Sequence, residues 1–162
     1  MTILITALLA LAAAAQEAPR SADAEILDIY NAVCVRGEDA PAEFRPVEWS
    51  TFPPALRLLN TYGHEGTFLL RDAGGRTVYI ARTSGAGRDS IVAAERRCGV
   101  AIRGANFNRL ARAFARQLGV RPLEMNMLGH KVVMLEAPQG VLSISEAEQG
   151  WIIVRAYDVS FR

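Results

Sequence analysis

Two cysteines, Cys34 and Cys98, are the side chains of this sequence with the most readily named chemistry. In an oxidising compartment the two would pair and close a loop of about 65 residues, which is worth roughly 4 kcal/mol of stability in chain-entropy terms. The alternative is that Cys98, which follows Arg96 and Arg97, is a thiolate nucleophile of lowered pKa. Because there are only two cysteines and the chain begins with an apparent export signal, we expect the disulfide.

Other residues that could do chemistry do not form a recognisable catalytic pattern. The two histidines, His64 and His130, lack the spacings typical of zinc sites, and no nucleophile elbow or phosphate-binding loop is present. Several carboxylates could pair in space as an acid and a base: Asp72, Glu136, Glu146, Glu148 and Asp158. We therefore assign no catalytic residue, no metal ligand and no cofactor, and we expect a protein that is not an enzyme.

Arginines give the sequence its one positive functional signal. Nine of them lie between Arg82 and Arg121, and Arg109, Arg112 and Arg116 fall on one side of a predicted helix. This face could bind an anionic surface or an acidic partner, or it could be a solvated face that pairs with the acidic first third of the same chain. Nucleic acid is not expected, because no aromatic residues interleave with the arginines and the chain carries an export signal.

The first 15 residues are apolar and uncharged, and they end in Ala13-Ala14-Ala15. This run is shorter than the roughly 20 residues that a membrane-spanning helix needs, and it is typical of a cleaved signal peptide. We therefore expect residues 1–15 to be a signal peptide and 16–162 to be a single exported domain, with an ordered core of about 21–160. The expected location is periplasmic or secreted, without a stable membrane span after cleavage.

Hydrophobic periodicity predicts the elements that position these residues. Helices are expected at 21–36, capped by Ser21 and ended by Gly37, at 55–62, and at 107–118, between Asn106 and Gly119. Strands are expected at 67–71 and 76–82 as a hairpin, at 99–103, and at 131–136, 141–146 and 151–157 as a three-stranded meander. Residues 83–90 are expected to be a loop, and 91–97 either a helical turn or an irregular segment. No internal repeat is visible. The predicted fold class is α+β, a mainly antiparallel sheet with about three helices packed against it.

The layout resembles small exported proteins of Gram-negative bacteria. The likeness consists of the alanine-rich leader, the helix that ends in Ala32-Val33-Cys34, the segment Phe52-Pro-x-Ala55-Leu-Arg, and the Cys98-Gly-Val-Ala strand before an amphipathic helix. The resemblance implies an exported protein with a disulfide. It implies no reaction, because that group has no assigned activity.

These observations favour a non-enzymatic binding or interaction domain of the cell envelope, monomeric or weakly self-associating, with an unidentified envelope protein or ligand as its partner. Two alternatives stay open. One is a small envelope hydrolase or transferase that uses carboxylate and histidine chemistry, and the other is association with anionic surfaces through the arginine face of the 107–118 helix.

Overall fold

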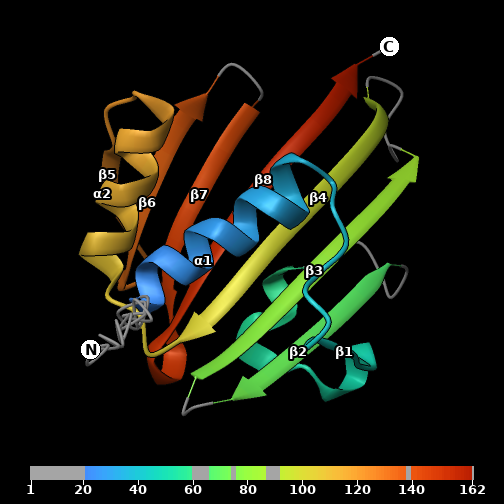
Figure 1. Cartoon of the computed structure of the whole chain (residues 1–162). Helices are drawn as coiled ribbons and strands as arrows, with labels where there is room; N and C mark the ends of the chain where they lie inside the picture. Colours follow the sequence, from blue (N-terminus) through green and yellow to red (C-terminus); the bar gives the residue numbers. More distant parts are fainter. Residues whose placement is uncertain (1–20, 60–65, 74–75, 87–91, 138–139, 162) are drawn as a thin grey trace, which may run out of the picture.

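A computed structural model describes residues 21–59, 66–73, 76–86, 92–137 and 140–161 (Figure 1). The predicted signal peptide and His64 lie outside these residues. Eight antiparallel strands form one sheet in the order β1-β2-β3-β4-β8-β7-β6-β5. The strands are β1 (Arg45–Pro46), β2 (Thr67–Ala73), β3 (Arg76–Ala86), β4 (Val92–Arg103), β5 (Leu123–Met127), β6 (His130–Ala137), β7 (Gly140–Ala147) and β8 (Trp151–Phe161). The α+β class and the mainly antiparallel sheet are thereby confirmed.

The architecture repeats although the sequence shows no repeat. A helix followed by four consecutive strands occurs twice along the chain: α1 (Ala22–Tyr30) precedes β1 to β4, and α2 (Phe107–Leu118) precedes β5 to β8. Each set of four strands is a meander, and the last strands of the two sets pair antiparallel at the centre of the sheet, where Val100 lies opposite Val154. The β4–β8 pair is thus the seam between two topologically equivalent halves.

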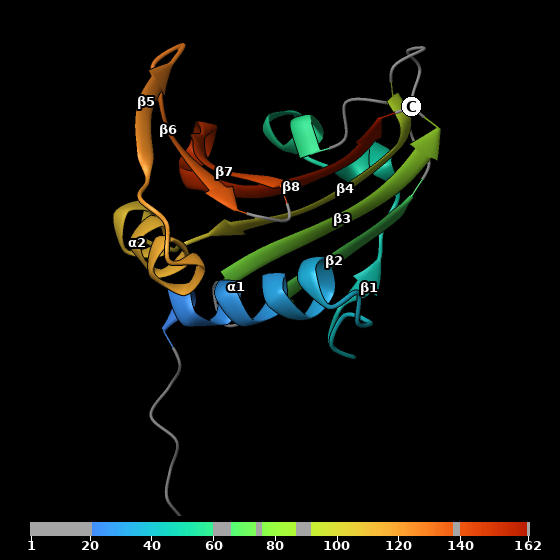
Figure 2. The same ribbon diagram turned by 90° about the horizontal axis from the view of Figure 1, so that it is seen from above.

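Both α-helices lie on one side of the sheet, and the shorter 3₁₀-helices lie on the other (Figure 2). One apolar stripe of the first helical stretch is buried: Ile26, Ile29 and Tyr30 of α1, and Val33 just beyond it. The buried side chains of α2 are Phe107, Leu110, Ala111, Phe114 and Ala115. These side chains pack against inward-facing residues of the strands, such as Val100, Ile102, Val133, Leu135 and Val154. Burial of this apolar stripe is what holds the helices to the sheet.

The predicted N-cap and the predicted end of α2 are both confirmed. Asn106 accepts a hydrogen bond from the backbone N–H of Arg109, and Gly119 ends the helix at a φ of +67°. Ser21 caps α1 in the same way through the N–H of Ala24. The chain continues past Tyr30 as a π-helix, η1 (Asn31–Val35), so the helical stretch as a whole matches the predicted 21–36.

Three expectations need correction. The third predicted helix, at 55–62, is a 3₁₀-helix, η3 (Pro54–Leu59), and it packs on the opposite face of the sheet from α1 and α2 through the fully buried Leu56. Residues 83–86, expected to be loop, instead extend β3, and residues 92–97, expected to be a helical turn or an irregular segment, extend β4. The β3–β4 register is continuous as far as the pair Ala86–Ala94, and an irregularity against β8 lies between Val92 and Ala94. Neither β5 nor the two-residue β1 was expected.

Aromatic side chains form a second core on that opposite face. The rings of Trp49 in η2 (Trp49–Thr51), Phe52 and Phe68 contact one another, and the contacts continue from Phe52 to Tyr79 and from Tyr79 to Trp151. The ring centroids of these pairs are 4.6 to 5.6 Å apart, in tilted or edge-on arrangements. The segment that carries Trp49 and Phe52 therefore covers this face of the sheet.

Candidate functional site

The disulfide is the first of the predicted sites that the structure allows us to place. Cys34 in η1 is bonded to Cys98 in β4, and their Cα atoms are 5.4 Å apart. The bond ties the end of the first helix to a central strand. A sulfur that is held in a disulfide is not available as a thiolate nucleophile, so the alternative role for Cys98 is not supported.

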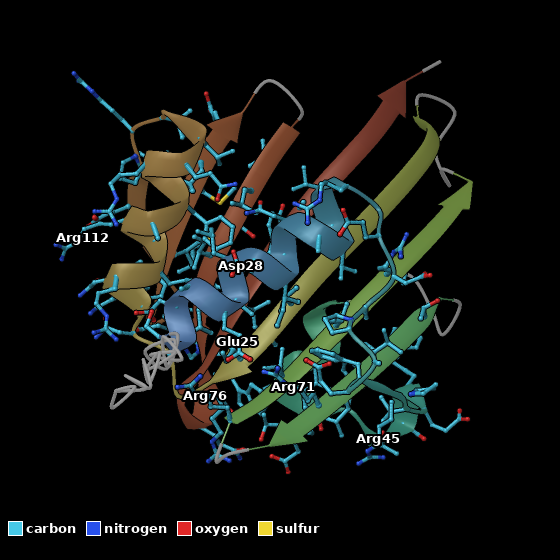
Figure 3. All side chains as sticks on the ribbon, viewed as in Figure 1. Glu25, Asp28, Arg45, Arg71, Arg76 and Arg112 are labelled. Carbon is cyan, nitrogen blue, oxygen red and sulfur yellow. A yellow bond between two sulfur atoms is a disulfide. The ribbon has the colours of Figure 1, made fainter. Side chains whose placement is uncertain are left out.

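The three arginines of the predicted basic face do not behave alike. The Nε atom of Arg109 lies 2.7 Å from the Oδ2 atom of Asp23 in α1. Arg112 and Arg116 are exposed and form no ion pair with any of the described residues, and Figure 3 shows Arg112 directed away from the sheet. Only two members of this face are therefore left to meet a partner, while Arg109 helps to join the two helices.

The candidate acid–base groups are not brought together among the described residues. His130 begins β6 opposite Met127, and Asp72 accepts a hydrogen bond from the hydroxyl of Thr77. Glu136 and Glu148 are exposed, and the side chain of Asp158 lies outside the description. Within the described ranges, no three His, Cys, Asp or Glu side chains are close enough to hold a metal ion. The same ranges contain no helix that is long and apolar enough to cross a membrane.

A charged groove of about 750 Å³ lies between α1 and the strands β2 and β3. The sequence did not predict it. Glu25 of α1 accepts hydrogen bonds from Arg71 in β2 and from Arg76 in β3, and Figure 3 shows all three converging. The guanidinium of Arg71 also lies 5.3 Å above the ring of Phe44. Three acidic and three basic side chains line the groove, so its charges balance, and these contacts anchor α1 to the sheet.

A smaller and more enclosed pocket, of about 130 Å³, lies between the carboxyl ends of α1 and α2. We call it the interhelical pocket. Its walls come from both helices and from the neighbouring ends of β7 and β8. The lining residues are Tyr30, Asn31, Val35, Phe114, Gln117, Leu118, Gly140, Val141, Leu142 and Ala156.

The local backbone shapes this pocket. Asn31 and Val35 lie at the two ends of the π-helix, and such segments are often found at functional sites because they change the direction in which side chains point. The Nδ2 atom of Asn31 donates a hydrogen bond to Oε1 of Gln117, 3.1 Å away, and this bond links the two helices at the pocket. Val35 and Val141 in the lining remain 55% and 36% exposed, so the pocket opens to solvent beside apolar side chains.

Tyr30 is the polar group of the pocket with no partner of its own. Its ring packs edge-on against that of Phe114, with centroids 5.1 Å apart and planes at 83°. The residue is 6% exposed, and its hydroxyl has no hydrogen-bond partner in the part of the chain that the structure describes. Burial raises the pKa of Tyr30 to about 12, so the hydroxyl keeps its proton at neutral pH and can donate or accept a hydrogen bond.

Apolar periodicity predicts that Tyr30 faces the core from the first helix and that Phe114 faces it from the second. Periodicity does not predict that these two residues meet, since the crossing of two helices depends on contacts distant in sequence. The sequence features that could have pointed to this pocket are Asn31 and Val35, which follow Tyr30 and are four residues apart. Neither is specific for a pocket.

Comparison with known proteins adds no relative to this description. No protein family, curated protein or solved structure matches the chain.

Proposed function

We propose that the protein is a non-enzymatic binding domain exported to the cell envelope, periplasmic or secreted, and that its ligand is a small, mainly apolar molecule with one hydrogen-bonding group. The interhelical pocket is the proposed site. The observation that carries the proposal is the hydroxyl of Tyr30, which belongs to a largely buried side chain of the pocket lining and has no hydrogen-bond partner among the described residues. The apolar leader and the disulfide support the exported location.

The energetics of the hydroxyl favour a ligand. A hydrogen bond between this hydroxyl and a ligand atom contributes about 1 kcal/mol. The walls formed by Phe114, Leu118 and Leu142 would cover the rest of the ligand. Tyr30 would then set the orientation of the ligand, and the apolar walls would supply most of the affinity.

The volume of the pocket limits the size of the buried group. A cavity of about 150 Å³ in another protein accepts benzene, so 130 Å³ corresponds to a single ring or a short branched acyl group. Larger ligands would have to leave part of their structure outside, beside Val35 and Val141.

Binding of paired probes would test the proposal. Phenol and toluene have the same size, but only phenol can bond to the hydroxyl of Tyr30. We expect phenol to bind the native protein about five- to tenfold more tightly than toluene, which is close to 1 kcal/mol, and we expect this ratio to fall to about one in Tyr30→Phe. Calorimetry or chemical-shift titration would measure both affinities.

Filling the pocket provides the matched control. Ala156→Leu places a larger side chain among the lining residues and should abolish binding of both probes, whereas Ala113→Leu, on α2 but outside the lining, should leave it unchanged. A native protein that binds neither probe, or a Tyr30→Phe variant that still prefers phenol, would refute the proposal.

Exposure of Arg112 and Arg116 favours a second candidate, association with an anionic surface. Their pairing would be electrostatic and therefore sensitive to salt. We expect the protein to float with vesicles containing anionic lipid at low ionic strength, and we expect Arg112→Glu combined with Arg116→Glu to remain unbound. Binding that persists in high salt would rule this mode out.

A further inference from the structure

The two edges of the sheet are built differently. The β1 edge is two residues long and contains Pro46, which has no N–H to offer a new strand. The β5 edge runs for five residues, Leu123–Met127, with neither a proline nor a lysine, and it pairs with β6 in unbroken register. Only the first edge therefore carries features that prevent pairing with another chain.

The β5–β6 hairpin also carries most of the large exposed hydrophobic side chains of the described residues. It projects beyond the body of the protein, away from α1 and α2 (Figure 2). Leu123, Met127 and Leu128 are 59%, 54% and 99% exposed, and they are three of the five large hydrophobic side chains that are exposed among the described residues. An apolar edge strand of this kind is a typical site of strand addition.

The turn of the hairpin identifies the backbone groups that are free. Leu128 and Gly129 have φ values of 53° and 85°, the left-handed pair of a two-residue type I′ turn. Met127 and His130, which flank such a turn, form a hydrogen-bonded pair, so alternate residues of β5 direct their backbone groups toward β6. The N–H and C=O groups of Glu124 and Asn126 consequently point outward.

We propose that β5 pairs antiparallel with β5 of a second copy of this chain, around a two-fold axis at Met125. This inference is independent of the proposed ligand. In this register Glu124 of each copy exchanges two hydrogen bonds with Asn126 of the other, which uses all four outward-facing groups on each strand. Leu123 lies opposite Met127 of the second copy, and the two Met125 side chains meet at the axis.

The neighbouring registers are less favourable. An axis at Glu124 would place two carboxylates directly opposite each other, which is destabilising in a sheet. An axis at Asn126 would place Leu123 opposite Gly129 and Glu124 opposite Leu128, so the apolar side chains would lose their partners. The Met125 register alone matches apolar with apolar and polar with polar.

Charge complementarity supports the same register. Asn126 pairs with Lys131 in β6, so Lys131, Asn126 and Glu124 of the second copy share one row on one face of the joined sheet. Two strand spacings separate the lysine from that carboxylate, or about 10 Å between backbones, which the two side chains can span. The two-fold axis creates this pair twice. Lys131 is the one lysine of the sequence.

Cysteine cross-linking of the full chain tests the axis. Directly opposed residues of a non-hydrogen-bonded pair have Cα atoms about 4.5 Å apart, a distance that suits a disulfide. We expect Met125→Cys to form a covalent dimer under mild oxidation, seen on a non-reducing gel. The matched control is Leu123→Cys, on the same face of the strand. In the proposed register Leu123 lies opposite Met127 of the second copy, so the two new cysteines would be four residues apart along the strand. This variant should remain monomeric on the gel.

Charge reversal tests the same register without a new cysteine, in case that cysteine disturbs the native disulfide. Glu124→Lys and Lys131→Glu should each weaken the dimer about tenfold in sedimentation equilibrium, because each creates two repulsive pairs. The double variant restores both pairs, so its affinity should return to within about threefold of the native value. A native chain that sediments as a monomer at every concentration would overturn the proposal. Equal cross-linking of the two cysteine variants, or a double variant no better than the singles, would overturn it as well.

Discussion

Asp23, in the first turn of α1, lies 2.7 Å from Arg109 of α2 through its Oδ2 atom, while its Oδ1 atom accepts a hydrogen bond from the backbone N–H of Asn106 at 3.0 Å. The carboxylate is almost completely buried. One side chain of the first helix therefore holds the beginning of the second, in addition to the cap that Asn106 itself provides.

The first prediction concerns this carboxylate. Asp23→Ala should lower the free energy of unfolding by about 2 kcal/mol, because it removes both a charge-assisted hydrogen bond to the N–H of Asn106, at a partly buried position, and the ion pair with Arg109. Arg109→Gln removes only the ion pair and should cost less than about 1 kcal/mol, since the arginine side chain is 68% exposed. Urea denaturation of both variants would measure the difference. Equal losses would mean that the ion pair, and not the backbone bond, dominates.

The second prediction concerns the disulfide. Reduction, or the replacement of both cysteines by serine, should lower the melting temperature, with a loss of up to about 4 kcal/mol for a loop of this length. Calorimetry with and without reductant would measure it. The double serine variant should be insensitive to reductant. Native protein that reacts with two equivalents of a thiol reagent before unfolding would contradict the pairing of Cys34 with Cys98.

The third prediction concerns the dependence of stability on pH. Burial holds the pKa of Tyr30 at about 12 in the folded protein, above its ordinary value of 10. Between these values the unfolded chain loses the proton and the folded chain keeps it, so this contribution to stability is complete below pH 10 and falls as pH rises toward 12. The loss can reach about 3 kcal/mol. Denaturation at pH 9 and pH 11 should show a smaller decrease for Tyr30→Phe than for the native protein. An identical decrease in both would show that another group is responsible.

The fourth prediction concerns Gly66, just before β2. Its φ is +146°, and a Cβ atom there would overlap the backbone carbonyl oxygen of Arg82, which cannot move without disturbing β3. Gly66→Ala should therefore cost about 2 kcal/mol or more. Gly104→Ala is the matched control, because Gly104 also has a positive φ, of +91°, but open space around it. We expect a clearly smaller loss there, and equal losses in thermal melts would exclude the overlap as the cause.

Local sequence signals predicted the fold where local physics determines it. Ser21, Asn106 and Gly119 marked helix ends because caps and left-handed turns depend on neighbouring residues. The strand at 123–127 was missed, because Leu123, Met125 and Met127 alternate with polar residues over too short a stretch between Pro122 and Gly129. The extension of β4 through Arg96 and Arg97 was missed because partners on both sides, β3 and β8, impose it.

The candidate site was less predictable than the fold. Cys34 and Cys98 could be paired from their number and the apparent export signal. Pairing of the arginine face with the acidic first third of the chain was also considered, and the Arg109–Asp23 ion pair is one such contact. The meeting of Tyr30 with Phe114, and of Glu25 with Arg71 and Arg76, depends on how α1 crosses its neighbours. No periodicity in a single sequence carries that information.

The position of the disulfide within the two-part architecture has a consequence for the order in which the chain can be built. Cys34 and Cys98 both belong to the first helix and its four strands, so a chain emerging from its amino end contains the complete covalent link before any residue of β5 to β8 exists. The second half is then added to a first half in which the disulfide can already have formed. Its final strand, β8, completes the sheet by pairing with the open edge of β4. A chain that stops short of Trp151 would leave the backbone groups of that edge free to pair with a strand of another chain.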